Sequence, residues 1–239
     1  FAFAIWDGRR QCLFAARDRF GIKPFYYALD DNRFRFASNT QALLAGGGID
    51  TAIDPVGLHF QYTLHAVIPA PHTILRGIRK LEPAHSLQLD ANGTQTLRRY
   101  WNLDATRLAE PRSEQEWVDA THEALLAAVR KRNDVADVPV GVLLSGGLDS
   151  SLLVALLAEI GVRDFHTFSG GFEDQPEEKG SEFEFSDQVV ERYRPIHHKF
   201  LVPNDQVLER LPEAVDAMAE PMFGQDAVAF YLLSEQVSK

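Results

Sequence analysis

The loop Ser145–Ser151, with the sequence Ser-Gly-Gly-Leu-Asp-Ser-Ser, combines residue types that suit a phosphate group. Gly146 and Gly147 let backbone N–H groups approach an anion closely, because glycine has no Cβ. A helix that follows the loop would add free N–H groups and the positive end of its dipole. Asp149 would repel phosphate unless a cation lay between them, which points to Mg²⁺. The loop has no Lys, so it is not the P-loop of ordinary nucleotide hydrolases.

Two further groups of polar residues are candidates for chemistry. We interpret the charge cluster of Arg17, Asp18, Arg19 and Lys23 as an ion-paired turn rather than a catalytic group. His197-His198 suggests a metal site, but adjacent residues on a strand point to opposite faces and cannot readily share one ion. We therefore expect a structural role for both histidines. Cys12, the single cysteine, has the pattern of a small core hydrophobe.

The composition excludes several classes of protein. The 239 residues are 45% hydrophobic and 24% charged, which is typical of a globular protein. A formal net charge of −10 argues against a nucleic-acid partner. No apolar run approaches the ~20 residues that cross a bilayer, so no membrane partner is expected. One cysteine allows no internal disulfide, and we expect a reducing, cytoplasmic location.

The first third of the chain reads as antiparallel strands joined by short turns. Asn92-Gly93 is the strongest hairpin signal in the chain. The predicted strands are Phe1–Asp7, Gln11–Asp18, Phe25–Asp30, Arg33–Ser38, His85–Asp90 and Gln95–Trp101, with short helices at Thr40–Ala45 and Pro55–His65.

After a polar linker the pattern changes to alternating strands and helices. Ser113 and Glu116 form a capping-box pattern that predicts the start of a helix. The predicted strands are Val138–Leu144, Phe165–Ser169 and His197–Val202, and the predicted helices are Asp149–Ile160, Phe183–Arg194, Asp205–Ala219 and Val228–Ser234. This order favours a doubly wound α/β domain, which would place the Ser145–Ser151 loop at the carboxyl end of a buried strand. Both termini look as if they interrupt folded structure, so we expect an internal piece of a longer polypeptide.

With these motifs the chain resembles ATP pyrophosphatases and, more narrowly, glutamine-hydrolysing asparagine synthetases. The first resemblance is Ser145–Ser151 after the strand Val-Gly-Val-Leu-Leu. The other similar stretches, in family order, are Arg17–Tyr27, Phe36–Ser38, Pro69–Ile74, Gly77–Leu81, Arg99–Trp101, Phe165–Gly171, His197-His198 and Glu220-Pro221. The resemblance implies that residues 1–103 end an N-terminal-nucleophile glutaminase domain (glutamine amidotransferase type 2). Residues 104–112 would then be a linker, and residues 113–239 the first part of a doubly wound, parallel-sheet ATP-pyrophosphatase domain.

The resemblance also implies a reaction and its site. ATP would activate the carboxylate of aspartate as an acyl-adenylate, and ammonia from glutamine would then give asparagine, AMP, pyrophosphate and glutamate. The implied ATP- and pyrophosphate-binding residues are Leu144, Ser145, Gly146, Gly147, Leu148, Asp149, Ser150, Ser151 and Gly170, with Asp149 also holding Mg²⁺. The nucleophilic cysteine of the glutaminase would lie upstream of Phe1, and a second acidic synthetase motif would lie beyond Lys239. We therefore expect no glutaminase catalytic residue within the chain, and no activity from this stretch alone.

One stretch departs from the family pattern. Gly224 and Asp226 stand where asparagine synthetases often have Asp and Ser, and Asn39 stands where Glu is frequent. We take Glu220, Gly224 and Asp226 as candidate acceptor-site residues, with aspartate or a small peptide acid such as N-acetylglutaminylglutamine as the acceptor. A non-catalytic relative that kept the fold is the alternative from another class. A second copy of the chain is left open as a partner.

Overall fold

The computed structural model describes residues 1–30, 33–107, 110–174, 176, 179–222 and 226–238. The chain divides into two compact units, and each is described by itself. Unit 1 contains Phe1–Thr106 together with Val215–Gly224, and unit 2 contains Arg107–Ala214 together with Gln225–Lys239. A stretch from late in the chain therefore belongs to the first unit.

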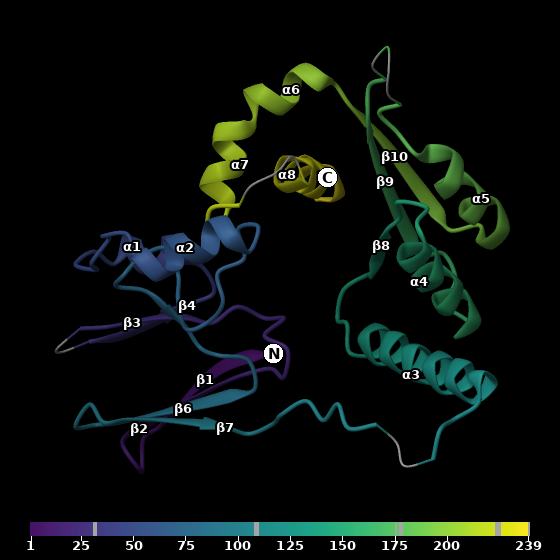
Figure 1. Cartoon of the computed structure of the whole chain (residues 1–239). Helices are drawn as coiled ribbons and strands as arrows, with labels where there is room; N and C mark the ends of the chain where they lie inside the picture. The colour runs from purple at the N-terminus through teal and green to yellow at the C-terminus, as the bar shows by residue number, and fades with distance from the viewer. Residues whose placement is uncertain (31–32, 108–109, 175, 177–178, 223–225, 239) are drawn as a thin grey trace. The chain divides into compact units, whose positions relative to one another are not determined.

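Unit 1 contains two antiparallel sheets (Figure 1). The first sheet has the order β1-β2-β6-β7, and its strands are β1 (Ala2–Asp7), β2 (Cys12–Arg17), β6 (His85–Asp90) and β7 (Gln95–Arg99). Ala15 pairs with Ala4 on one side and with Leu87 on the other, which fixes the register. The hairpin predicted at Asn92-Gly93 is confirmed, and Gly93 takes a φ of +85° that glycine adopts without strain.

The second sheet has the order β4-β3-β5, with β3 (Tyr26–Leu29), β4 (Phe34–Ala37) and β5 (Arg79–Lys80). The short strand β5 was not predicted, because two residues are too few to show an alternating pattern. A core cluster draws on residues of both sheets and their flanks: Ala15, Phe25, Tyr27, Leu81 and Leu87. Helix α1 (Thr40–Ala45) packs on this sheet through Leu43, and α2 (Pro55–Thr63) begins at the cap Asp54.

Unit 2 is built on a parallel sheet with the order β8-β9-β10. Its strands are β8 (Gly141–Leu143), β9 (His166–Phe172) and β10 (Ile196–Val202). Its helices are α3 (Glu114–Asp134), α4 (Leu148–Glu159), α5 (Phe183–Tyr193), α6 (Asn204–Glu209), α7 (Leu211–Ala217, which ends in unit 1) and α8 (Asp226–Val237). The Ser113–Glu116 capping box is confirmed at the start of α3.

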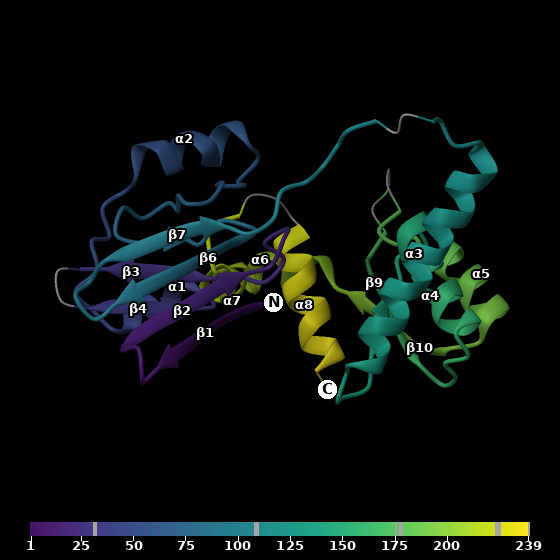
Figure 2. The same ribbon diagram turned by 90° about the horizontal axis from the view of Figure 1, so that it is seen from below.

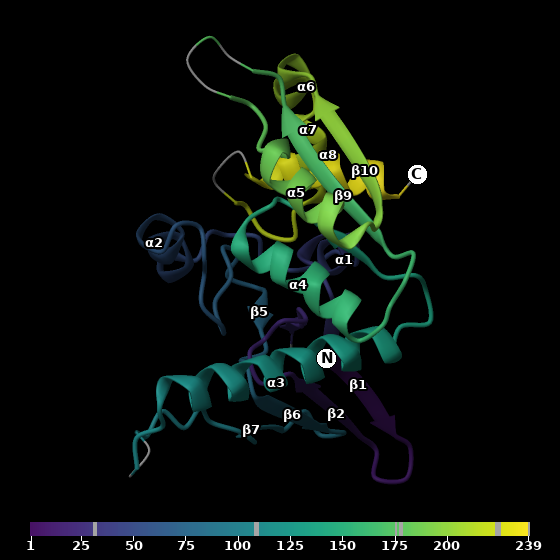
Figure 3. The same ribbon diagram turned by 90° about the vertical axis from the view of Figure 1, so that its right-hand side faces the viewer.

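Helices cover both sides of this sheet. Helices α4 and α5 lie on one side and α8 on the other (Figure 2), while β9 and β10 run side by side (Figure 3). The core under α4 is formed by buried apolar side chains, namely Val129, Val142, Leu144, Val154, Leu156, Leu157 and Phe165. None of the helices in the described ranges is both long and apolar enough to span a bilayer.

Two predicted elements differ from the structure. The predicted helix Asp205–Ala219 is two helices, α6 and α7, that meet at Arg210. Pro212 lies in the first turn of α7, where its missing N–H breaks no helical hydrogen bond, so it marks a new start. The predicted strand Val138–Leu144 pairs only over Gly141–Leu143. Val138 is 71% exposed, so the apolar run is longer than the buried strand.

Candidate nucleotide site

The Ser145–Ser151 loop begins where β8 ends and runs into α4. Leu144 is 1% exposed, and its N–H donates to the Phe168 carbonyl at 2.8 Å. The Ser169 hydroxyl donates to the Leu144 carbonyl. Both bonds join Leu144 to β9, so the residue just before the loop is fixed against the sheet. The loop therefore leaves the carboxyl end of a parallel strand, where open α/β sheets bind ligands.

Gly146 can be no other residue without strain. Its φ is +88°, in the region that L side chains rarely adopt. A Cβ at this position would lie 2.5 Å from the Ser186 backbone nitrogen and 2.6 Å from the Phe185 Cβ. The glycine therefore lets the start of α5 pack directly against the loop.

The hydroxyl groups of the loop hold its turn. Ser145 Oγ accepts from the Gly147 N–H at 3.3 Å and lies 3.1 Å from Ser150 Oγ. Ser150 Oγ also donates to the Gly147 carbonyl at 3.2 Å. Gly147 is the N-cap of α4 and makes no side-chain capping bond. The first turn of α4 thus keeps N–H groups without a capping side chain, which suits an anionic ligand.

Asp149 lies in the first turn of α4 and is exposed to solvent. Within the described ranges no three His, Cys, Asp or Glu side chains are grouped closely enough to enclose a metal. An exposed single carboxylate fits Mg²⁺, which keeps several waters and shares phosphate oxygens with one or two protein carboxylates. The residues present therefore suit a metal that arrives with a nucleotide.

A cavity of 690 Å³ in unit 2 opens beside this loop. Of the predicted residues, Leu144, Ser145 and Gly170 line it, whereas Gly146–Ser151 form the adjoining turn and helix start. The cavity is also lined by Ser169, Lys179 and Asn204, which the sequence analysis missed. Lys179 and Asn204 lie in polar stretches with no motif, so only the fold reveals them. The volume is in the usual range for a small-molecule site.

Comparisons with known proteins agree with this geometry. A family model described as asparagine synthase matches residues 120–239, which include the Ser145–Ser151 loop and the cavity. The chain belongs to the asparagine synthase family. A second family model, described as a glutamine amidotransferase domain, matches residues 1–101 and so most of unit 1.

The relatives are longer than this chain. Glutamine-hydrolysing asparagine synthetase 3 of Bacillus subtilis is 34% identical over 229 residues, which cover 90% of this chain and 36% of that protein. Asparagine synthetase 1 of the same organism is 29% identical over the whole chain, again 36% of its own length. An amidase of Gibberella zeae is 36% identical over 162 residues, covering 67% of this chain and 23% of the amidase. The chain thus spans about a third of the length of the synthetases it matches.

Of the three candidate acceptor residues, the structure describes the surroundings of Glu220 alone, so their shared role stays a prediction. Glu220 belongs to unit 1, where its carboxylate contacts Lys80 and Tyr26. Gly224 lies outside the described residues, and of Asp226 only its place at the start of α8 is described. Asn39, also a departure from the family pattern, is the N-cap of α1, and its side chain accepts from the Ala42 N–H at 2.8 Å.

The charge cluster is a turn, as predicted, but it is not held by ion pairs among its own side chains. Asp18 accepts backbone N–H groups from Phe20, Ile22 and Lys23. Burial acts to raise the pKa of Asp18, but these three donors outweigh it and lower the pKa to about 2. Arg17 instead donates to backbone carbonyls, those of Gly21, Lys23 and Leu81. Sequence reasoning paired the charges with one another because a backbone partner leaves no trace in residue type.

The divergence of the two histidine side chains and the burial of the cysteine are confirmed. His197 Nδ1 lies 2.8 Å from Thr167 Oγ1, whereas His198 Nε2 lies 2.8 Å from His166 Nδ1. The neighbouring side chains thus have different partners on β9, as alternation along a strand requires. Cys12 is buried and free.

Proposed function

We propose that the protein containing this chain is an ATP-dependent, glutamine-hydrolysing amide ligase of asparagine-synthetase type. The observation that carries the proposal is the Ser145–Ser151 loop, whose glycine at φ +88° packs against α5 beside a 690 Å³ cavity. In the first step a carboxylate oxygen of the acceptor attacks the α-phosphorus of ATP, and the bond to pyrophosphate breaks. In the second step ammonia attacks the acyl carbon, AMP leaves and the nitrogen loses a proton. Hydrolysis of glutamine to glutamate supplies the ammonia.

The chain's own residues would act mainly by holding charge. Negative charge builds on the α-phosphorus and on the departing pyrophosphate, so oriented donors at these oxygens are the largest catalytic contribution. The N–H groups at the start of α4 are such donors, and the Ser151 hydroxyl would add another. Mg²⁺ at Asp149 would supply further positive charge at the phosphates. Leu144 and Gly170 would line the adenine and ribose side of the cavity.

The direct test is isotope exchange between ATP and pyrophosphate in the full-length protein. We expect exchange only when the carboxylate acceptor is present, because adenylation needs the acceptor oxygen as the nucleophile. Exchange that ran equally well without an acceptor would contradict adenylation, as would the absence of exchange with every acid tried.

A second candidate acceptor is an N-acylated peptide acid. Gly224 stands where many synthetases have an Asp, so a carboxylate that could pair with the α-ammonium of free aspartate is missing. An acylated peptide has no such ammonium and would lose nothing. This substitution favours an amidotransferase on a small peptide as the alternative.

A further inference from the structure

Residues 215–222, which we name the crossing segment, are held by unit 1 although the chain on either side of them belongs to unit 2. Three side chains of unit 1 donate to backbone carbonyls of the segment. Thr40 Oγ1 donates to Ala219, Gln41 Nε2 to Met218 and Gln61 Nε2 to Pro221. Ala219 also packs against the core cluster around Leu43. The segment is therefore docked through its main chain, by contacts that do not depend on most of its side chains.

The exception is a buried ion pair. Lys80 Nζ lies 2.5 Å from Glu220 Oε2, and the two side chains are 9% and 16% exposed. The same ammonium donates to the Ile68 carbonyl at 2.7 Å, and the Tyr26 hydroxyl lies 3.3 Å from Glu220 Oε2. Burial, together with the Glu220 carboxylate, raises the pKa of Tyr26, so its hydroxyl keeps its proton.

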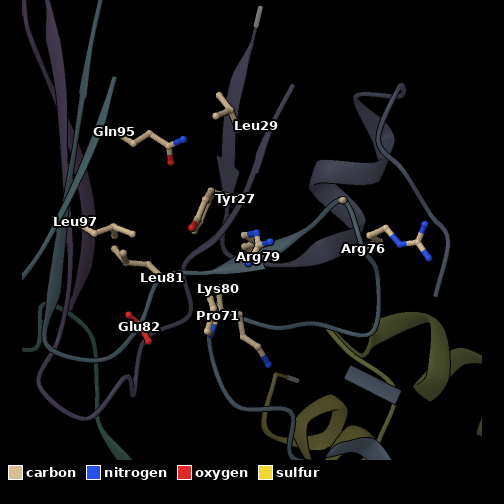
Figure 4. A pocket seen from close by; sticks show the side chains of 11 residues that line it. Tyr27, Leu29, Pro71, Arg76, Arg79, Lys80, Leu81, Glu82, Gln95 and Leu97 are labelled. Carbon is tan, nitrogen blue, oxygen red and sulfur yellow. The ribbon is translucent and has the colours of Figure 1, made fainter. Parts of the chain in front are cut away.

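Strand β5 directs the Lys80 side chain towards Glu220. Figure 4 looks into a 510 Å³ cavity of unit 1 that Tyr27 and Arg79 line, and the Lys80 ammonium points away from it. Arg79 and Lys80 are neighbours on β5, so their side chains leave the strand on opposite faces. A two-residue strand is thus enough to direct one ammonium to the crossing segment.

Stability alone does not explain this pair. A buried ion pair is often no more stabilising than apolar side chains of the same size, because both charges lose water. What the pair adds is position, since carbonyl acceptors recur at every residue, whereas the segment has carboxylates only at Asp216 and Glu220, and Lys80 pairs with Glu220. Glu220 Oε1 is buried without a hydrogen-bond partner in the described part of the chain, so Lys80 is the main partner of this carboxylate. A shift of the segment would leave the Lys80 ammonium buried without its carboxylate, which is strongly unfavourable.

The crossing segment is connected in sequence to a helix that lines the nucleotide cavity. Helix α8 begins at Asp226, shortly after Glu220, and its residue Ala229 lines the 690 Å³ cavity together with Ser145 and Gly170. We infer that Lys80 and Glu220 are positioning residues that couple the two half-reactions, by holding the segment that leads into α8. The inference rests on the proposed function. Because such coupling is reciprocal, a ligand in the cavity should also steady the crossing segment.

The test uses Lys80→Met in the full-length protein, with Lys199→Met as the matched control. Lys199 forms a lysine–carboxylate pair with Asp187 at 2.6 Å, but the two side chains are 40% and 49% exposed. Two quantities are measured. One is hydrogen exchange of residues 215–222 with and without ATP. The other is the ratio of glutamate released to amide formed, beside the ATP-independent glutaminase rate.

We expect ATP to slow exchange of the crossing segment in the wild type and in Lys199→Met, but not in Lys80→Met. In Lys80→Met the glutamate-to-amide ratio should rise at least ~threefold, while the ATP-independent glutaminase rate stays within ~twofold. An unchanged glutamate-to-amide ratio in Lys80→Met would overturn the inference. Hydrogen exchange that rises equally throughout unit 1 would also overturn it. If Lys80→Met does not fold, Lys80→Gln should give the same changes in smaller size, because its amide N–H can still donate to Glu220. If the wild type forms no amide at all, the proposed function fails, and the ATP effect on exchange decides the inference by itself.

Discussion

Two short loops that each contain an aspartate behave in opposite ways. In unit 1, the Asp18 carboxylate accepts three backbone N–H groups and Arg17 donates to three carbonyls, and both side chains are buried. In unit 2, the Ser145–Ser151 loop leaves Asp149 exposed and the start of α4 without a capping side chain. The first loop has satisfied its own polar groups, whereas the second keeps donors and a carboxylate for a ligand. The sequence already indicates different roles for the two loops, and hydrogen-bond satisfaction gives the physical reason.

The largest expected effect is the loss of amide formation when the Ser145–Ser151 loop is changed. Asp149→Asn should lower amide formation by at least ~100-fold, because it removes the charge partner of Mg²⁺ without changing side-chain size. Glutaminase activity should stay within a few-fold, because the match to a glutamine amidotransferase domain covers residues 1–101 and not this loop. Glutamate and amide are measured on the same variant, with Asp187→Asn as an exposed control in unit 2. Equal loss of both activities would mean that Asp149 is structural, which would remove the contrast between the loops.

The next largest effect is a loss of local stability when the backbone of the Ser145–Ser151 loop is strained. Gly146→Ala should destabilise the start of α4 by about 2–4 kcal/mol, because the new Cβ meets both a positive φ and the α5 backbone. Gly147→Ala is the matched control, since its φ is −69° and its nearest contact is 3.4 Å away. It should cost less than ~1 kcal/mol. Hydrogen exchange of the α4 amides measures both, and equal values would contradict the argument.

The stability contributed by the Arg17–Lys23 loop should depend on pH rather than on ligands. The pKa of Asp18 is lowered from 3.8 to about 2, so its contribution to stability is complete above pH 3.8. That contribution should fall away as the pH drops from 3.8 to 2, a loss of about 2 kcal/mol. Urea unfolding of the wild type and Asp18→Asn, followed by tryptophan fluorescence between pH 2 and 5, measures it. Near pH 5 the variant should have a lower free energy of unfolding than the wild type. Its free energy of unfolding should also change less between pH 2 and 5. Parallel curves for the two proteins would show that Asp18 is not the titrating group.

The smallest effect is on acceptor choice. We expect an N-acylated glutamine dipeptide to be a better acceptor than free aspartate, and Gly224→Asp with Asp226→Ser to shift the ratio of kcat/KM towards aspartate by about tenfold. A charged hydrogen bond to the α-ammonium is worth about 1.5–3 kcal/mol, which is enough for such a shift. Steady-state kinetics with both acceptors is the measurement. A wild type that already prefers aspartate by about tenfold would leave plain asparagine synthesis as the function.

Much of the fold could be predicted because its signals are local. The Asn92-Gly93 turn and the Ser113–Glu116 capping box each depend on a few neighbouring residues, and both are confirmed. The glycines of the Ser145–Ser151 loop were expected from phosphate chemistry, and the structure adds a packing reason at Gly146 that no sequence pattern shows. The division of the long predicted helix at Arg210 was signalled by Pro212, but the apolar periodicity on both sides masked it.

What could not be predicted depends on contacts between distant residues. Glu220 is predicted as an acceptor-site residue from the neighbouring departures from the family pattern, and the sequence gives no sign of its ion pair. Its partner Lys80 lies on a two-residue strand 140 positions earlier, and neither residue type indicates the other. The cavity residues Lys179 and Asn204 are likewise brought to Ser145 only by the order of the parallel sheet.

The discontinuity of unit 1 limits how such proteins can be recombined. A gene fusion that joined a foreign amidotransferase half at Thr106 would bring in a new partner for residues 215–222 without the side chains that dock them. Conversely, unit 1 expressed alone to Thr106 would carry the Lys80 ammonium with no carboxylate beside it and an uncovered Leu43 cluster. We expect such a truncation to be poorly soluble, and grafting to succeed only when both stretches of the unit are exchanged together. The two units therefore have to be exchanged as a matched pair, because one stretch of unit 1 is encoded within unit 2.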